Sequence, residues 1–322
     1  METATIAVLI AFFANIILCP LVIPILKRIK FGQNVRDDGP QSHLKKTGTP
    51  TMGGIIILIS FLVSCVFFLQ GNTEGLLVAF VTIAFGIIGF LDDYIKVVKK
   101  RSLGLKAKQK IALQLIASAI FLFALSTIEG GEYSKFFIPF LGGRYIDTYV
   151  LFIPVSIFIM LGTVNGVNLT DGLDGLAAGV TVLVATFFLV IAWAVNSELL
   201  PITAAAAGSL LGFLLFNTYP AKVFMGDTGS LALGGFIAAV AIVLRMPVFL
   251  VIVGFIYVLE TVSVILQVGY FKMTNGKRIF KMAPLHHHFE LSGMSESKVV
   301  AAFYIATVIF VLVGFLATQG IV

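Results

Sequence analysis

The feature that most constrains this chain is a series of long apolar runs that follow one another from the first residues to the last. A bilayer core about 30 Å thick needs roughly 20 apolar residues for each helical span. About ten runs meet this requirement: 4–26, 51–70, 75–95, 109–128, 148–166, 175–195, 200–217, 228–245, 247–271 and 299–318. Hydrophobic residues make up 59% of the chain and charged residues 12%, which is more apolar surface than a soluble domain can bury. We therefore predict an all-α polytopic membrane protein of about ten transmembrane helices, with residues 1–322 forming one domain.

The distribution of lysine and arginine predicts which ends of these helices face the cytoplasm. The first run is preceded by METAT, which has no basic segment, and is followed by KRIK. We therefore expect a membrane span with its N-terminus outside, not a cleavable signal peptide. Alternation from there puts most basic residues on the inner side, in the segments 27–50, 92–108, 165–175, 217–228 and 272–298. Both termini are then expected on the outer side, where 129–147, with its aromatic residues and paired glycines, predicts a small hairpin.

The net charge of +6 has two interpretations. Topology alone concentrates Lys and Arg on the inner side. Anionic membrane lipids or a polyanionic substrate at that face would favour the same distribution. No nucleic-acid partner is expected, because the basic residues are divided among loops between the spans. Cys19 and Cys65 lie in apolar runs and are expected to be packing residues.

The third apolar run ends in two adjacent aspartates. Asp92 and Asp93 close the run, and Lys96 follows four residues after Asp92, on the same helix face. A plain i,i+4 ion pair would need only one carboxylate. Two adjacent carboxylates at a membrane boundary repel each other unless a cation or a proton relieves them. This pattern favours a functional site over an ordinary helix end.

The stretch NGVNLTDGLDG places a polar residue at every third position. If it is helical, these residues form one slowly drifting stripe: Asn165, Asn168, Asp171 and Asp174. Gly172 and Gly175 would let a ligand approach the backbone closely. The alternative is an Asn/Asp/Gly-rich turn with a helix cap. Because a charge in hydrocarbon costs about 2.5–3.5 kcal/mol, we expect these residues to line an aqueous cleft.

A glycine-flanked turn, VFMGDTGS, precedes the eighth run. Backbone N–H groups at such a helix start suit a phosphate, and the Asp227 carboxylate suits a hard cation. The alternative for Asp227 is an ordinary N-cap. Phe224 has two equal interpretations, an aromatic ring that stacks on a planar base and a membrane-interface aromatic.

The stretch KMAPLHHHFELSG holds three consecutive histidines. Neighbours on a helix project about 100° apart, so His286, His287 and His288 cannot all bind one metal ion, and zinc is disfavoured. One or two of them can donate hydrogen bonds to phosphate oxygens. Lys45 is either a cationic arm for phosphates or a topology signal. Hard oxygen ligands combined with cationic donors point to Mg²⁺ and phosphates, and so to phosphoryl transfer at the membrane surface.

Five stretches together resemble the phospho-N-acetylmuramoyl-pentapeptide-transferase branch of the polyprenyl-phosphate sugar-1-phosphate transferase family: TPTMGG, LDDYIKV, NLTDGLDGLA, NTYPAKVFMGDTGSLALGG and APLHHHFE. The resemblance covers nearly the whole chain, and APLHHHFE is its most specific part. It implies that UDP-N-acetylmuramoyl-pentapeptide reacts with undecaprenyl phosphate to give lipid I and UMP, with Mg²⁺ as cofactor. It also implies a bacterial plasma membrane location, with the active site in a cleft at the cytoplasmic face.

The resemblance implies three catalytic aspartates. Asp227 would bind Mg²⁺, and Asp92, with Asp93 beside it, would deprotonate or orient the lipid phosphate. Direct attack by the lipid phosphate is favoured over a phospho-aspartyl intermediate, because a phosphate monoester, with a second pKa of about 6, is already an anionic nucleophile.

The substrate-binding residues are implied in the same way. Asp171 and Asp174 would shape the nucleotide pocket, with Asp174 nearest the uridine. Phe224 would stack on uracil, and Asn168 and Asn217 would help to hold the nucleoside and the cleft. A further group would neutralise phosphate charge: Lys45 and His286, supported by His287 and His288.

Three alternatives remain at this point. A sister transferase acting on a UDP-N-acetylhexosamine is disfavoured only by APLHHHFE. A membrane prenyltransferase is disfavoured because its aspartates cluster without interleaved glycines. An ion-coupled transporter needs acidic residues in mid-span; Glu260 alone qualifies, and we expect it to be a polar helix-packing contact. The sequence leaves the oligomeric state open, with a homodimer as one alternative.

Overall fold

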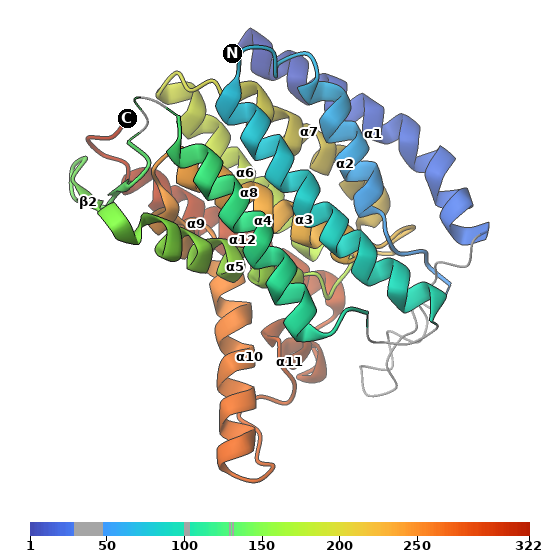
Figure 1. Ribbon diagram of the computed structural model, residues 1–322. Helices are drawn as coiled ribbons and strands as arrows, with labels where there is room; N and C mark the ends of the chain where they lie inside the picture. The colour runs from blue at the N-terminus through green and yellow to red at the C-terminus, as the bar shows by residue number, and fades with distance from the viewer. Residues whose placement is uncertain (29–47, 100–103, 129, 131) are drawn as a thin grey trace.

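The computed structural model describes residues 1–28, 48–99, 104–128, 130 and 132–322 (Figure 1). Its elements, in order, are α1 (Glu2–Arg28), α2 (Gly54–Cys65), α3 (Thr73–Val98), α4 (Ala107–Ser126), β1 (Lys135–Phe137), β2 (Tyr145–Asp147), η2 (Tyr149–Leu151), α5 (Phe152–Thr170), α6 (Leu176–Ala194), α7 (Leu200–Asn217), α8 (Gly226–Val243), η3 (Pro247–Phe249), α9 (Leu250–Val253), α10 (Phe255–Met273), α11 (Leu285–Leu291) and α12 (Glu296–Leu316).

The prediction of an all-α polytopic membrane protein is confirmed. Within the described ranges, nine helices are long and apolar enough to cross a bilayer: α1, α3, α4, η2 with α5, α6, α7, α8, α10 and α12. Helices suit this environment because they satisfy their own backbone hydrogen bonds where lipid offers no partners. The second predicted run, 51–70, yields only the 12-residue α2. Residues before α2 pair instead with a distant loop, since Gly53 N–H donates to Phe224 O at 2.8 Å and Phe224 N–H donates to Pro50 O at 2.8 Å.

Helix α8 forms the centre of the bundle. Of its spanning window, 89% is buried, and α3, α5 and α2 pack against it. Two glycines allow its first turn to be approached closely. A Cβ on Gly89 of α3 would lie 2.0 Å from the Asp227 carbonyl oxygen, and one on Gly54 of α2 would lie 2.1 Å from the Gly229 nitrogen. Small residues are typical of close helix contacts in membranes, and here they bring α2 and α3 against the start of α8.

The two ends of α8 mark two ends of the bundle. Asp227 lies at its start, which we call the aspartate end. At the other end Arg245 O accepts a hydrogen bond from Phe137 N at 2.8 Å, and β1 pairs antiparallel with β2, Lys135 opposite Asp147. We call this the hairpin end; the predicted hairpin is confirmed.

Both chain termini lie away from the aspartate end. Phe140 N–H donates to Ala317 O at 3.1 Å, so the end of α12 lies beside the hairpin. Helices α1 and α7 run parallel, because Gly208 approaches Val8 and Gly212 approaches Asn15. The N-terminus therefore lies at the opposite end from Asn217, the last residue of α7 (Figure 1).

The ninth predicted run, 247–271, is broken in the structure. The 3-10 helix η3 ends at Phe249, the short α9 that follows it ends at Val253, and α10 begins at Phe255. Gly254 has φ −95° and ψ 23°, outside the helical region, and this residue separates the two helices. Helix α10 then extends beyond the rest of the bundle with α11 beside it (Figure 1).

Candidate active site

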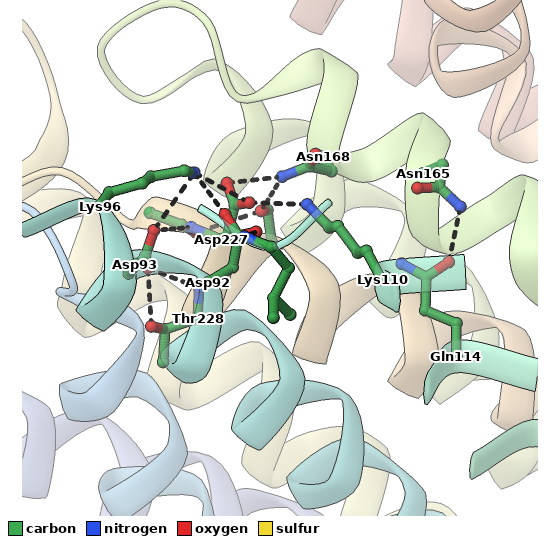
Figure 2. A network of polar contacts seen from close by, with 12 residues as sticks. Asp92, Asp93, Lys96, Lys110, Gln114, Asn165, Asn168, Asp227 and Thr228 are labelled. Atoms are coloured by element: carbon green, nitrogen blue, oxygen red, sulfur yellow. Dashed lines mark hydrogen bonds and ion pairs between the residues drawn. The ribbon is translucent and has the colours of Figure 1, made fainter. Parts of the chain in front are cut away.

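Three aspartates come together at the aspartate end. Asp92 and Asp93 come from the last turns of α3, and Asp227 comes from the first turn of α8. Each offers one carboxylate oxygen, and these oxygens lie within 4.8 Å of one another (Figure 2). The side chains of Asp92 and Asp93 are 4% exposed and that of Asp227 is 17% exposed. The predicted catalytic aspartates therefore form one cluster.

Two lysines neutralise part of this negative charge. Lys96 Nζ lies 2.7 Å from Asp92 Oδ2 and 3.1 Å from Asp227 Oδ2. Lys110, from α4, places its Nζ 2.7 Å from Asp227 Oδ2 (Figure 2). The i,i+4 pair of Lys96 with Asp92 is therefore present, but Lys96 also bridges to α8. Lys110 was not predicted as a site residue.

Asp93 serves the start of α8 as a cap. Its Oδ1 accepts from Asp227 N at 3.2 Å, and its Oδ2 accepts from Thr228 N at 2.9 Å and Thr228 Oγ1 at 2.8 Å. A carboxylate at a helix N-terminus satisfies free N–H groups and interacts favourably with the helix dipole. Asp93 therefore fixes the position of Asp227 as well as adding charge. Asp92 is held separately, by Leu105 N–H at 2.8 Å.

Helix α5 presents two asparagines to this cluster and to α4. Asn168 Nδ2 donates to Asp227 Oδ1 at 3.1 Å and to Ser230 Oγ at 2.8 Å. Asn165 Nδ2 donates to Gln114 Oε1 at 3.0 Å, four residues beyond Lys110 on α4 (Figure 2). In the structure Asn168 therefore orients the Asp227 carboxylate, and its part in holding the nucleoside and the cleft stays a prediction.

The expected helical stripe stops after its first half. Helix α5 ends at Thr170, so Asp171 and Asp174 lie in a turn, not on the helix. Gly175 closes this turn with φ +79°, a conformation that glycine adopts readily. The alternative interpretation, an Asn/Asp/Gly-rich turn, is right for this part of the motif.

The turn containing Asp171 and Asp174 packs against the loop before α8. Asp174 Oδ2 accepts from Ala221 N at 2.9 Å, and Asn217 Nδ2 donates to Val223 O at 2.9 Å. Both contacts hold the loop that carries the half-buried Phe224. Burial, together with the nearby charges of Asp227 and Asp93, raises the pKa of Asp171 to about 8.

The three histidines make three different contacts. His286 is 1% exposed, and its Nδ1 lies 3.1 Å from Glu260 Oε2. His287 Nδ1 lies 3.1 Å from Glu290 Oε2 on the same helix, and His288 Nδ1 accepts from Lys281 N at 3.1 Å. Glu260 of α10 contacts His286 of α11, so it is a polar packing residue between two helices, as expected from the sequence. Its partner His286 is one of the predicted site residues. The predicted Lys45 lies outside the described residues.

The aspartate cluster fits a divalent cation. Its donors are carboxylate oxygens, the hard ligands that Mg²⁺ prefers. Among the residues that the structure describes, three carboxylates face two ammonium groups, so this part of the cluster keeps an excess of negative charge. From the sequence, Asp227 alone was expected to bind the metal; the geometry brings Asp92 and Asp93 close enough to share an ion with it.

Comparisons with known proteins give a consistent result. The model of Glycosyl transferase family 4 matches residues 75–245, and phospho-N-acetylmuramoyl-pentapeptide-transferase signature 1 matches residues 46–58. The phospho-N-acetylmuramoyl-pentapeptide-transferase of Caldicellulosiruptor bescii is 49% identical over 314 residues, 97% of each chain. That of Desulforamulus reducens is 52% identical over 316 residues, 96% of this chain and 94% of the relative. The chain belongs to the phospho-N-acetylmuramoyl-pentapeptide-transferase family.

In this member of the transferase family, Lys110 and Glu260 contact predicted site residues although neither was itself predicted as a site residue. Lys110 and Asp227 are 117 positions apart, and Glu260 and His286 are 26 positions apart. Neither pair has a local spacing that a motif could reveal. The only sequence signals were a lysine near a helix start and a lone acid within an apolar run.

Proposed function

We propose that this chain transfers phospho-N-acetylmuramoyl-pentapeptide from its UDP-linked precursor to undecaprenyl phosphate, forming lipid I and releasing UMP. The observation that carries the proposal is the cluster of three carboxylates and two lysines at one end of a bundle of apolar helices. A dissolved diphosphate and a phosphate on a lipid tail can meet only at such a membrane boundary. The named relatives, about 50% identical over nearly the whole chain, support the same substrate.

The reaction needs one bond to form and one to break. An oxygen of the lipid phosphate attacks the sugar-linked phosphorus, and the bond from that phosphorus to the bridging oxygen breaks, so that UMP leaves with this oxygen. Asp227, with Asp92 and Asp93, would hold Mg²⁺, which neutralises charge on the diphosphate. Asp92 takes any proton remaining on the attacking phosphate. Lys96 and Lys110 are placed to exchange their carboxylate contacts for substrate phosphate oxygens.

We infer from the basic loops that the aspartate end faces the cytoplasm of a bacterial plasma membrane. In sealed vesicles of known orientation, UMP release is then expected only when the UDP-linked substrate is on the cytoplasmic side.

The direct test is release of labelled UMP by purified protein. UDP-N-acetylmuramoyl-pentapeptide and undecaprenyl phosphate should give UMP and lipid I with Mg²⁺ and none after chelation. UDP-N-acetylglucosamine in place of the muramoyl substrate should give no UMP. Release of UMP from that sugar alone would point to the sister transferase, and no UMP from either would reject the proposal.

A further inference from the structure

Two side chains of α12 fasten this helix to the turn 171–175. Glu296, the first residue of α12, accepts a hydrogen bond at its Oε1 from Asp174 N at 2.8 Å. Tyr304, about two turns further along the helix, donates from its hydroxyl to Gly175 O at 2.6 Å. The backbone of the turn is therefore held by α12 at both Asp174 and Gly175. Neither Glu296 nor Tyr304 was predicted as a site residue.

The Tyr304 ring occupies space that two glycines leave open. A Cβ on Gly179 of α6 would lie 2.1 Å from the Tyr304 hydroxyl oxygen, and one on Gly175 would lie 3.3 Å from the same atom. Gly175 O also accepts from Gly179 N at 2.9 Å, the bond that starts α6, and a carbonyl oxygen can accept two hydrogen bonds. Tyr304 therefore adds a link between α12 and the turn without being needed for α6 to begin.

The same turn is joined to the loop before α8 and lies near the aspartate cluster. Asp174 Oδ2 accepts from Ala221 N at 2.9 Å, in the loop that carries Phe224. Burial and the nearby charge of Asp227 raise the pKa of Asp171, so the start of the turn lies within electrostatic reach of the cluster. A displacement of the turn would therefore move the Asp174 carboxylate relative to the rest of the site.

We propose that Glu296 and Tyr304 are positioning residues, which hold the Asp174 carboxylate in place for the uridine nucleotide of the UDP-linked substrate. The proposal rests on the proposed function and assigns α12 to the nucleotide part of the site. Glu296 holds the backbone of Asp174, and the Asp174 carboxylate holds the loop of Phe224, so α12 and this loop are connected through one residue. Because both residues act through the turn, nucleotide binding should depend on them more than binding of the lipid substrate does.

The first test is Tyr304→Phe, which keeps the ring beside Gly179 and removes only the hydroxyl. The dissociation constant of UMP, measured by isothermal titration calorimetry on purified protein with Mg²⁺, should rise about fivefold, the scale of one hydrogen bond. The KM for the UDP-linked substrate should rise by a similar factor. The KM for undecaprenyl phosphate should change less than about twofold.

The matched control is Tyr257→Phe. The buried Tyr257 hydroxyl lies 2.8 Å from Thr181 Oγ1, so this variant also removes a tyrosine hydroxyl that contacts α6, but not one that contacts the turn. We expect its dissociation constant for UMP to stay within about twofold of wild type. Equal weakening in Tyr257→Phe and Tyr304→Phe would show a general loosening of α6 and would overturn the positioning role.

Two variants at Glu296 separate the hydrogen bond from the charge. Glutamine keeps an acceptor oxygen for Asp174 N–H, whereas alanine removes it. Both remove a negative charge from the first turn of α12, where it interacts favourably with the helix dipole, so both should lower the thermal unfolding midpoint. The dissociation constant of UMP should nevertheless rise about tenfold in Glu296→Ala and stay within about twofold of wild type in Glu296→Gln.

Unchanged UMP affinity in Tyr304→Phe and Glu296→Ala, or no UMP binding by wild type, would overturn the positioning role. Equal losses in Glu296→Gln and Glu296→Ala would overturn it as well, because charge and not the hydrogen bond to Asp174 would then control affinity. If wild type bound UMP more tightly than these variants but released none from the UDP-linked substrate, the positioning role would stand and the proposed function would fail.

Discussion

The aspartate end and the hairpin end of the bundle each carry a charged cluster, and the two are built differently. At the hairpin end Glu132 contacts Lys135 and Arg245, and these side chains are 49%, 26% and 23% exposed. At the aspartate end the carboxylates of Asp92 and Asp93 are only 4% exposed. Water screens the first cluster, where one acid faces two bases. In the second, Lys96 is partly exposed but Asp92 and Asp93 are buried, and among the described residues the three acids outnumber the two bases.

The contrast in burial shows which of the two clusters needs a partner other than water to balance its charge. Exposed ion pairs contribute little because water solvates either partner alone. A buried carboxylate without a full countercharge is unfavourable unless a cation or proton joins it. The excess negative charge at the aspartate end is therefore better explained by a cation and phosphates that bind there than by a contribution to stability.

The largest expected effect is that of Asp227→Asn. This change removes the charge that both lysines contact, while its side-chain oxygen can still accept from Asn168. We expect UMP release to fall by about 10³-fold or more, the scale seen when a main electrostatic contact of a transition state is lost. The thermal unfolding midpoint in detergent should change little. Turnover within tenfold of wild type would contradict a central role for this carboxylate.

Lys110→Met should have the next largest effect. It removes one ammonium group from Asp227, so the cluster becomes more negative and the Mg²⁺ concentration for half-maximal activity should decrease. Maximal UMP release should nevertheless fall about 10²-fold, because a cation for phosphate charge is lost.

The hairpin end supplies the control for this change. Lys135→Met removes a lysine from the Glu132 contact, outside the aspartate cluster. It should leave both the Mg²⁺ dependence and the UMP release rate unchanged. Equal losses in the two variants would remove the distinction between the ends.

Asp171→Asn tests the contrast between the two ends through the pH dependence of protein stability. Burial raises the pKa of Asp171 to about 8, so the folded protein keeps a proton that the unfolded chain loses near pH 4. Wild-type stability from this group therefore falls as pH rises from about 4 to 8. In metal-free buffer the thermal unfolding midpoint of Asp171→Asn should rise relative to that of wild type as pH increases from about 5 to 8.

The contribution of Asp147, at the hairpin end, to stability should change with pH in the opposite direction. Hydrogen bonds from the Ser134 hydroxyl and from Tyr149 N–H lower the pKa of Asp147. Its contribution is present above the unfolded pKa near 4 and is lost as pH falls through the lower folded value. The thermal unfolding midpoint of Asp147→Asn should therefore fall relative to that of wild type as pH rises through about 4. If the midpoints of Asp171→Asn and Asp147→Asn changed with pH in the same direction, this contrast would be contradicted.

The sequence predicted what depends on local pattern. Apolar length identified the helices, and the motifs around Asp92 and Asp227 identified two parts of the site because each motif is complete within a few residues. The break at Gly254 and the short α2 were missed, because an apolar run gives no sign of where its backbone leaves the helix. Lys110 and Glu260 were missed as site residues because their partners come from other helices.

The smallest expected effect is that of Glu132→Gln at the hairpin end. The Glu132 carboxylate accepts from Lys135 and from Arg245, the latter at 3.0 Å, and these contacts lower its pKa. All three groups remain open to water, so the thermal midpoint should fall by less than about 2 °C. Any fall should shrink further at high salt, which screens exposed pairs, and UMP release should be unchanged.

The buried counterpart is Asp93→Asn, which weakens the acceptor for two N–H groups and a hydroxyl at the start of α8. The thermal unfolding midpoint of Asp93→Asn should fall more than that of Glu132→Gln, and this fall should depend less on salt. A larger, salt-sensitive loss in Glu132→Gln than in Asp93→Asn would reverse the proposed contrast between the two ends.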